Sequence, residues 1–159
     1  MVNNKITLYN ALTNMSVHLR HLLIADTVLL DSLTGKASAI GLFDVINISP
    51  EKTSEIVNFS ILGQLVFHEL PKEKIDVLVN LSKPDGTSEK QVTLSLDAPP
   101  TETPVPLQIP LIVNFMGTEI SQAGNYDITI TVNGFAPEIQ RVGTFQAVKV
   151  TAPAVEDHA

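Results

Sequence analysis

The chain has 159 residues, of which 44% are hydrophobic and 17% charged, and its net charge is −7. This length and composition are typical of one globular domain with a substantial core, and they exclude a disordered chain. No apolar run approaches the roughly 20 residues of a membrane-spanning helix. With only ten scattered Lys and Arg residues, the chain is not expected to bind nucleic acid or an anionic membrane surface.

The sequence contains no cysteine. Disulfides, thiolate metal ligands and a thiol nucleophile are therefore excluded. The N-terminal residues lack the basic segment, apolar segment and cleavage site of a signal peptide. Both observations favour a cytoplasmic protein, although cysteine-free extracellular and virion proteins are also common.

Residues 1–18 have no clear period. They contain several apolar side chains and fit either a short strand or the beginning of a helical turn. We expect an N-terminal arm that is packed on the domain or used for assembly.

Residues 22–48 predict the first β-hairpin, because two long apolar runs flank a turn at 34–36. A three-residue loop with Gly35 in the left-handed region would place Asp26 directly opposite Asp44. A two-residue turn would shift the register by one and put the two aspartates on different faces. We expect the first register because it aligns the apolar faces of the two strands.

The rest of the chain alternates apolar and polar residues with a period of two, which is typical of half-buried strands. Gly63, in the middle of one such run, indicates a bulge or the close approach of another backbone. Residues 84–86, Pro-Asp-Gly, predict a tight turn, and the proline-rich segment 98–110 predicts an edge crossing between two sheets. The further strands are expected near 56–68, 75–82, 92–97, 109–115, 126–132 and 141–150.

With about eight strands and no convincing helix, the sequence predicts an all-β fold, an antiparallel two-sheet β-sandwich that is immunoglobulin-like or C2-like. The sandwich domain is expected over residues 19–150, between the N-terminal arm (1–18) and a flexible tail (151–159).

Several short segments resemble a bacterial β-sandwich family described only as a domain of unknown function. They are Ala25-Asp26, Gly35-Lys36, Gly41-Leu42-Phe43-Asp44, Pro84-Asp85-Gly86 and Gly124-Asn125-Tyr126. The resemblance covers roughly residues 19–150. It implies a compact two-sheet domain, and it implies no reaction, cofactor or catalytic residue.

Asp26 and Asp44 are the candidate functional residues, since each interrupts an apolar stripe. Two carboxylates held close together raise one pKa or bind a cation, which would permit acid–base chemistry or a metal site. Ca²⁺ requires about six to eight oxygen ligands, and Asp31, Asn47 and Asp127 do not complete a recognisable motif. The structural alternative is that each aspartate accepts hydrogen bonds near a bulge or edge and fixes the register.

The histidines are weaker candidates. His18 and His21 would share a face of a helix but point to opposite faces of a strand. His68 ends a strand, and no third ligand lies at a useful spacing, so we expect histidines of the surface or rim. No serine lies in a Gly-flanked nucleophile elbow.

We therefore expect no catalytic site and no cofactor. The leading interpretation is a non-enzymatic module that acts through protein–protein contacts, as an interaction or scaffold domain. Long edge strands and an apolar N-terminal arm favour self-association into a dimer or higher oligomer. The alternatives are a structural subunit of a virion or appendage and a calcium-assisted binding domain that uses Asp26 and Asp44.

Overall fold

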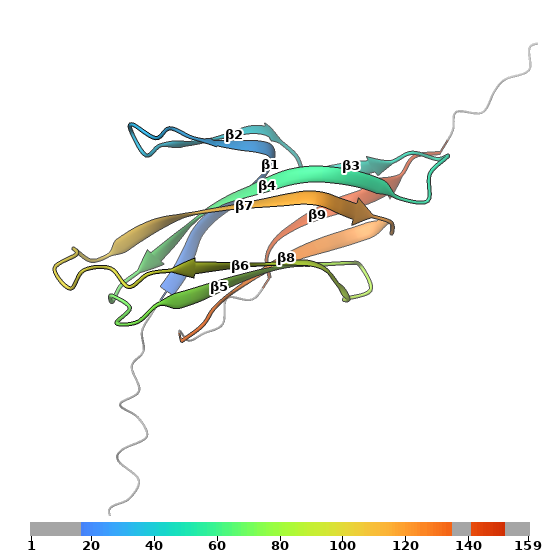
Figure 1. Cartoon of the computed structure of the whole chain (residues 1–159). Helices are drawn as coiled ribbons and strands as arrows, with labels where there is room; N and C mark the ends of the chain where they lie inside the picture. Colours follow the sequence, from blue (N-terminus) through green and yellow to red (C-terminus); the bar gives the residue numbers. More distant parts are fainter. Residues whose placement is uncertain (1–16, 135–140, 152–159) are drawn as a thin grey trace, which may run out of the picture.

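The computed structural model describes residues 17–134 and 141–151, which form nine β-strands in two facing sheets (Figure 1). The strands are β1 Val17–Leu30, β2 Ala37–Leu42, β3 Val45–Ile48, β4 Glu55–Phe67, β5 Ile75–Ser82, β6 Ser88–Leu96, β7 Leu107–Ile120, β8 Gly124–Val132 and β9 Arg141–Lys149. The four-stranded sheet has the order β2-β1-β4-β7, and the five-stranded sheet has the order β3-β9-β8-β5-β6. The described part of the chain forms no helix that could cross a membrane.

The predicted all-β two-sheet sandwich is confirmed, with nine strands where about eight were expected. Neighbouring strands are antiparallel, except that β3 and β9 run parallel. Strand β1 begins at Val17, inside the segment predicted as an N-terminal arm. The rest of that arm, 1–16, and the tail from 152 onward lie outside the described residues.

The additional strand arises because the second half of the predicted first hairpin is divided between the two sheets. Residues 37–42 pair with β1 as β2, whereas residues 45–48 form β3 beside β9. Gly41 has a φ of +70°, in the left-handed region that interrupts an extended chain. Phe43 and Asp44 then carry the backbone across to the five-stranded sheet.

The register of the first hairpin differs from both predicted registers. Thr27 pairs with Ile40, and Ala25 pairs with Leu42. Asp26 therefore lies opposite Gly41 and not opposite Asp44.

The turn explains this difference, because it begins at Asp31. The N–H of Gly35 donates to the carbonyl oxygen of Asp31 at 2.8 Å. The N–H of Asp31 donates to the carbonyl oxygen of Lys36, also at 2.8 Å. The Asp31 carboxylate accepts the Thr34 hydroxyl at 2.6 Å and the Leu33 N–H at 2.9 Å. These bonds, that of Thr34 foremost, lower the pKa of Asp31. Gly35 has the predicted left-handed conformation, with a φ of +66°.

The predicted turn at residues 84–86 joins β5 to β6, and Gly86 has a φ of +84°. The Asp85 carboxylate accepts the Thr87 hydroxyl at 2.6 Å and the side-chain amide of Gln122 at 2.9 Å. These two bonds, with the Thr87 backbone N–H, lower the pKa of Asp85 to about 2. The β5–β6 turn is thus tied to the β7–β8 turn.

Aromatic rings fill the centre of the core. Phe59 stacks on Phe115 with ring centroids 4.9 Å apart, and Tyr126 stacks on Phe145 at 5.2 Å. Phe59 and Phe145 meet edge to face at 5.5 Å, so the two stacked pairs are joined. All four rings are buried.

The Tyr126 hydroxyl is buried and accepts hydrogen bonds from the backbone N–H groups of Ser121 at 3.2 Å and Gln122 at 3.1 Å. Tyr126→Phe keeps the ring but removes the acceptor of both N–H groups. We expect the free energy of unfolding to fall by about 1–3 kcal/mol, measured by chemical denaturation. Equal stability of the two proteins would contradict this role of the hydroxyl.

Candidate functional site

The first hairpin projects from the sandwich as a two-stranded ribbon, residues 26–42, called the ribbon below. Strand β1 pairs with β4 only as far as Ala25, and beyond that point it pairs with β2 alone. Figure 1 shows the ribbon standing away from β4 and β7.

Both faces of the ribbon carry exposed apolar side chains. Leu29, Ile40 and Leu42 share one face by strand alternation, and they are 53%, 53% and 62% exposed; this face is called the outer face. The opposite face carries Leu30, which is 54% exposed, and smaller apolar side chains that are partly exposed: Val28, Ala37 and Ala39. At the tip, Leu33 is 94% exposed. The ribbon therefore presents to solvent an apolar surface that a single domain leaves uncovered.

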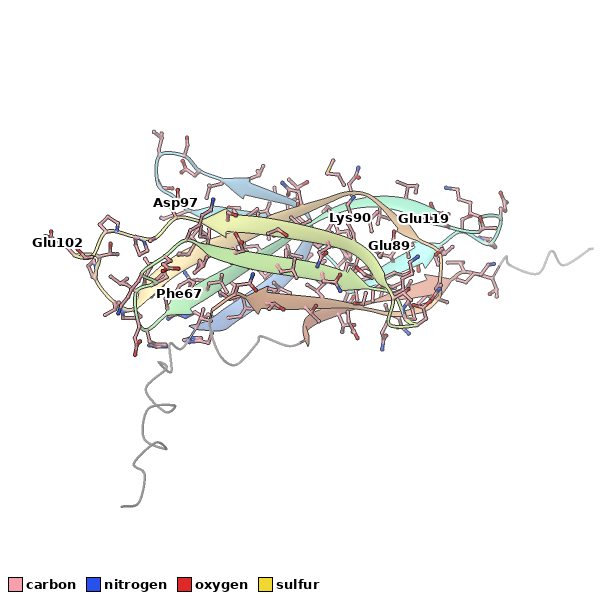
Figure 2. All side chains as sticks on the ribbon, turned by 60° about the horizontal axis from the view of Figure 1, so that its bottom comes forward. Phe67, Glu89, Lys90, Asp97, Glu102 and Glu119 are labelled. Carbon is pink, nitrogen blue, oxygen red and sulfur yellow. The ribbon has the colours of Figure 1, made fainter. Side chains whose placement is uncertain are left out.

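Strand β2 is an edge strand without the usual protection against pairing with another chain. Such edges are normally interrupted by charge, by proline or by shortness. Strand β7 contains Pro110 and Glu119, and β6 contains Glu89 and Lys90 (Figure 2). The Lys90 ammonium group also donates to the backbone carbonyl of Met116 in β7. Strand β3 has four residues, whereas the six residues of β2 include no charge and no proline.

A bulge in β1 lies beside the ribbon on the outer surface of the four-stranded sheet. The register of β1 against β4 shifts between Leu19 and Leu22. As a result, two residues of β1, Arg20 and His21, lie opposite the single residue Gln64 of β4.

Gly63 is the position in β4 that makes room for this bulge. A Cβ atom at Gly63 would lie 3.0 Å from the carbonyl oxygen of His21 and 3.1 Å from Cδ1 of Leu19. The close backbone approach, one of the two alternatives predicted for Gly63, is therefore confirmed, whereas the bulge lies in the neighbouring strand β1.

Gly63→Ala would force β1 away from β4 at the bulge, because the crowded neighbour is backbone. We expect the free energy of unfolding to fall by about 1–3 kcal/mol. Thermal or chemical denaturation measures the change, and an alanine variant as stable as the unsubstituted protein would contradict the close packing.

A cavity of about 440 Å³ lies between the ribbon and the outer surface of the four-stranded sheet. Gly35 and Ala37 of the ribbon bound it on one side. His21, Gln64 and Gln108, from β1, β4 and β7, bound it on the other. The volume is in the range of small-molecule sites.

Arg20 lies beside this cavity and is hydrogen-bonded to two of the side chains that line it. Its Nη1 donates to Oε1 of Gln64 at 3.2 Å and to Oε1 of Gln108 at 3.4 Å. The ion pairs in the described part of the chain are Lys52–Glu55 and Lys83–Glu89, so Arg20 has no carboxylate partner there. Sequence reasoning missed this cluster, because its members come from three strands.

The structure places the two candidate aspartates in different surroundings. The Asp26 carboxylate packs on Gly41, where a Cβ atom would lie 2.2 Å from Oδ2 of Asp26. Asp44 lines a second cavity, of about 460 Å³, together with Leu42 and Gly143. The expectation of two directly opposed carboxylates is therefore wrong.

No group of three or more His, Asp or Glu side chains that could hold a metal occurs within residues 17–134 and 141–151. A metal at Asp26 and Asp44 stays a prediction. The register that would have placed the two carboxylates opposite each other, on which this prediction was based, does not occur.

His18 lies beside His68, and not beside His21 as a metal pair on a helix would require. The Nε2 atom of His68 and the Nδ1 atom of His18 are 3.1 Å apart. In this bond one ring donates and the other accepts. The partners are fifty positions apart in the sequence, and only the pairing of β1 with β4 brings them together.

Comparisons with solved structures give matches of low identity. An alkylpurine DNA glycosylase from Pseudomonas fluorescens, bound to DNA containing an abasic site analogue, is 16% identical with a TM-score of 0.43; the match covers 84% of this chain but 30% of the glycosylase. The chain thus spans less than a third of that protein.

Two other structures are matched over nearly their whole length. A CARDB domain from Pyrococcus furiosus, in complex with di-metal ions, is 19% identical with a TM-score of 0.38, and 89% of this chain and 98% of that domain are covered. An immunoglobulin-like protein from Pseudomonas aeruginosa is 12% identical with a TM-score of 0.39, and the coverage is 85% and 98%. The overlap in shape is limited, so the fold rests on the protein's own sheets.

No curated protein sequence matches the chain. A family profile does match, over residues 20–138, and it is described as a family of unknown function, DUF6941. The match confirms the expected membership of an uncharacterised family and falls within the range of the predicted sandwich domain. The chain therefore belongs to DUF6941.

Proposed function

We propose that the protein is a non-enzymatic interaction module that associates with a second copy of itself through the ribbon. In the proposed dimer, the β2 strands of two copies pair antiparallel about a twofold axis. The outer-face side chains of β2, Ile40 and Leu42, then lie beside those of the second copy across the new strand pair. The observation that carries the proposal is the unprotected, apolar edge of β2 on a ribbon that stands away from its own sandwich (Figure 1).

The charge distribution supports a second copy as the occupant. The chain carries a net charge of −7, so two copies repel each other over most of their surfaces. Within the ribbon only Asp26, Asp31 and Lys36 are charged, and β2 itself is uncharged. A twofold axis brings identical surfaces together, and repulsion is weakest where the ribbons meet.

The exposed apolar surface sets the expected strength of the dimer. Fully burying one leucine or isoleucine side chain contributes about 1.5–3 kcal/mol, and side-by-side contact across the new strand pair buries only part of the Ile40 and Leu42 side chains. Association costs an estimated 4–15 kcal/mol, and each new strand hydrogen bond contributes about 0.5–1.5 kcal/mol. These opposing contributions are of similar size, so we expect a weak dimer, with a Kd in the micromolar range or above.

Sedimentation velocity over a range of protein concentrations tests the proposal. The mass is expected to rise from 17.2 kDa for the single chain to twice that value. A mass of one chain at every concentration would contradict self-association. Assemblies larger than a dimer would contradict twofold pairing of β2.

A further inference from the structure

The cavity beneath the ribbon is bordered by hydrogen-bond donors that bond to no acceptor within the described residues. A guanidinium group has five N–H donors and no acceptor. The bonds from Arg20 Nη1 to Gln64 and Gln108 therefore fix the direction of both amides, with Oε1 toward Arg20. Their two NH₂ groups and the remaining N–H groups of Arg20 stay available.

The fourth polar group at the cavity is the exposed imidazole of His21, which donates through at least one nitrogen in either charge state. The acidic side chain of the ribbon tip, Asp31, is committed to its own turn by bonds to Leu33 and Thr34. The cluster thus combines one permanent positive charge with several donors.

The cavity beside these donors also has the volume and the apolar walls that a ligand-binding site requires. The cavity has a volume of about 440 Å³, and Leu62 and Pro110 supply apolar wall beside the donors. Leu62 is buried although it faces away from the core, which is consistent with its position beneath the ribbon. A ligand that fits these walls has an oxyanion at one end and an apolar part at the other.

We propose that this cavity binds the oxyanion group, a carboxylate or a phosphate, of a small organic ligand. Arg20 and the amide groups of Gln64 and Gln108 donate to the oxyanion. In a regular strand, consecutive residues point to opposite faces of the sheet. The bulge in β1 changes this alternation, so that both Arg20 and His21 can lie beside the cavity. The site does not depend on self-association of the ribbon.

Titration of the full-length protein in ¹H–¹⁵N correlation spectra tests the proposal, with sodium phosphate and sodium butyrate as probes and sodium chloride at equal ionic strength as reference. We expect the side-chain NH₂ signals of Gln64 and Gln108 to shift and saturate in the millimolar range with at least one probe. Saturation with phosphate alone identifies a phosphate ligand, and saturation with butyrate alone identifies a carboxylate. If neither probe saturates, or chloride gives the same shifts, the proposal is wrong.

Three variants assign the binding to this cavity. Arg20→Gln removes the charge and is expected to weaken binding about tenfold or more. Gln108→Glu places a carboxylate in the cavity and is expected to abolish binding. Lys149→Gln removes the same charge from an exposed position on β9, in the other sheet, and should bind as the unsubstituted protein does. Equal affinity of Arg20→Gln and Lys149→Gln would overturn the assignment.

Discussion

Ile40→Lys is expected to abolish the dimer at concentrations at which the unsubstituted protein is fully associated. Ile40 lies in the middle of β2 on the outer face of the ribbon, and its side chain is 53% exposed. Lysine at an edge strand is the device by which natural sheets prevent pairing with another chain. Its ammonium group would have to lose water inside an apolar contact that offers no carboxylate. We expect the Kd to rise on the order of 100-fold or more.

Ile56→Lys is the matched control for this variant. Ile56 is a second exposed isoleucine, 66% exposed, and it lies on β4 outside the ribbon, opposite Glu119 of β7. The same side chain is introduced and the net charge changes equally, so we expect the dimer to persist. If both variants dissociate equally, or if neither does, the contact does not involve the outer face of the ribbon.

Phe59→Ala is expected to cause the largest loss of stability among substitutions in the core. The Phe59 ring stacks on Phe115 and meets the edges of Phe145 and Phe43, with centroids 4.9, 5.5 and 6.0 Å away. Removing it leaves a cavity between the sheets, and we expect the free energy of unfolding to fall by about 3–5 kcal/mol. This is a large share of the roughly 5–15 kcal/mol that stabilises a typical domain.

Two further substitutions make the measurement specific to packing. Phe59→Leu keeps most of the apolar volume and should lose clearly less stability than Phe59→Ala. Leu33→Ala removes an apolar side chain that is 94% exposed, so stability should change by less than about 0.5 kcal/mol. Equal losses for all three variants in chemical denaturation would contradict a core centred on the Phe59 ring.

The strands of the sandwich were predictable because their faces differ sharply. In β5 and β8 buried residues alternate with partly exposed ones almost without exception, and the two-residue period follows directly from that contrast. The close backbone approach at Gly63 was predictable for a similar reason. A glycine within a row of apolar residues indicates that a neighbouring backbone leaves no room for a side chain.

The first hairpin was predicted in part, because the ribbon has apolar residues on both faces. A register is set by burying one face and exposing the other, and in the ribbon neither face enters the core. The bonds of the Asp31 carboxylate decided the register instead. The separation of β2 from β3 depends on the positive φ of Gly41. The sequence did not reveal this break, because the apolar residues on both sides of Gly41 keep the same two-residue spacing.

The candidate site was hardly predictable from the sequence. Asp26 and Asp44 stood out because each interrupts an apolar run, but the pairing that would have joined them does not exist. Arg20, Gln64 and Gln108 are ordinary polar residues of three strands, and only the strand order β1-β4-β7 brings Arg20 within hydrogen-bond distance of Gln64 and Gln108, which line one cavity. Contacts of this kind depend on which strands are neighbours, which local periodicity does not encode.

Hydrogen exchange of the β2 amides at two protein concentrations, one below and one above the Kd, tests the central claim most directly. In a single chain, the N–H groups of β2 on the side away from β1 are open to solvent. If two β2 strands pair, these amides gain hydrogen-bond acceptors, and their exchange is expected to slow as the concentration rises. Amides at the free edge of β7 should exchange at the same rate in both samples. Exchange of β2 that does not depend on concentration would contradict the proposed dimer.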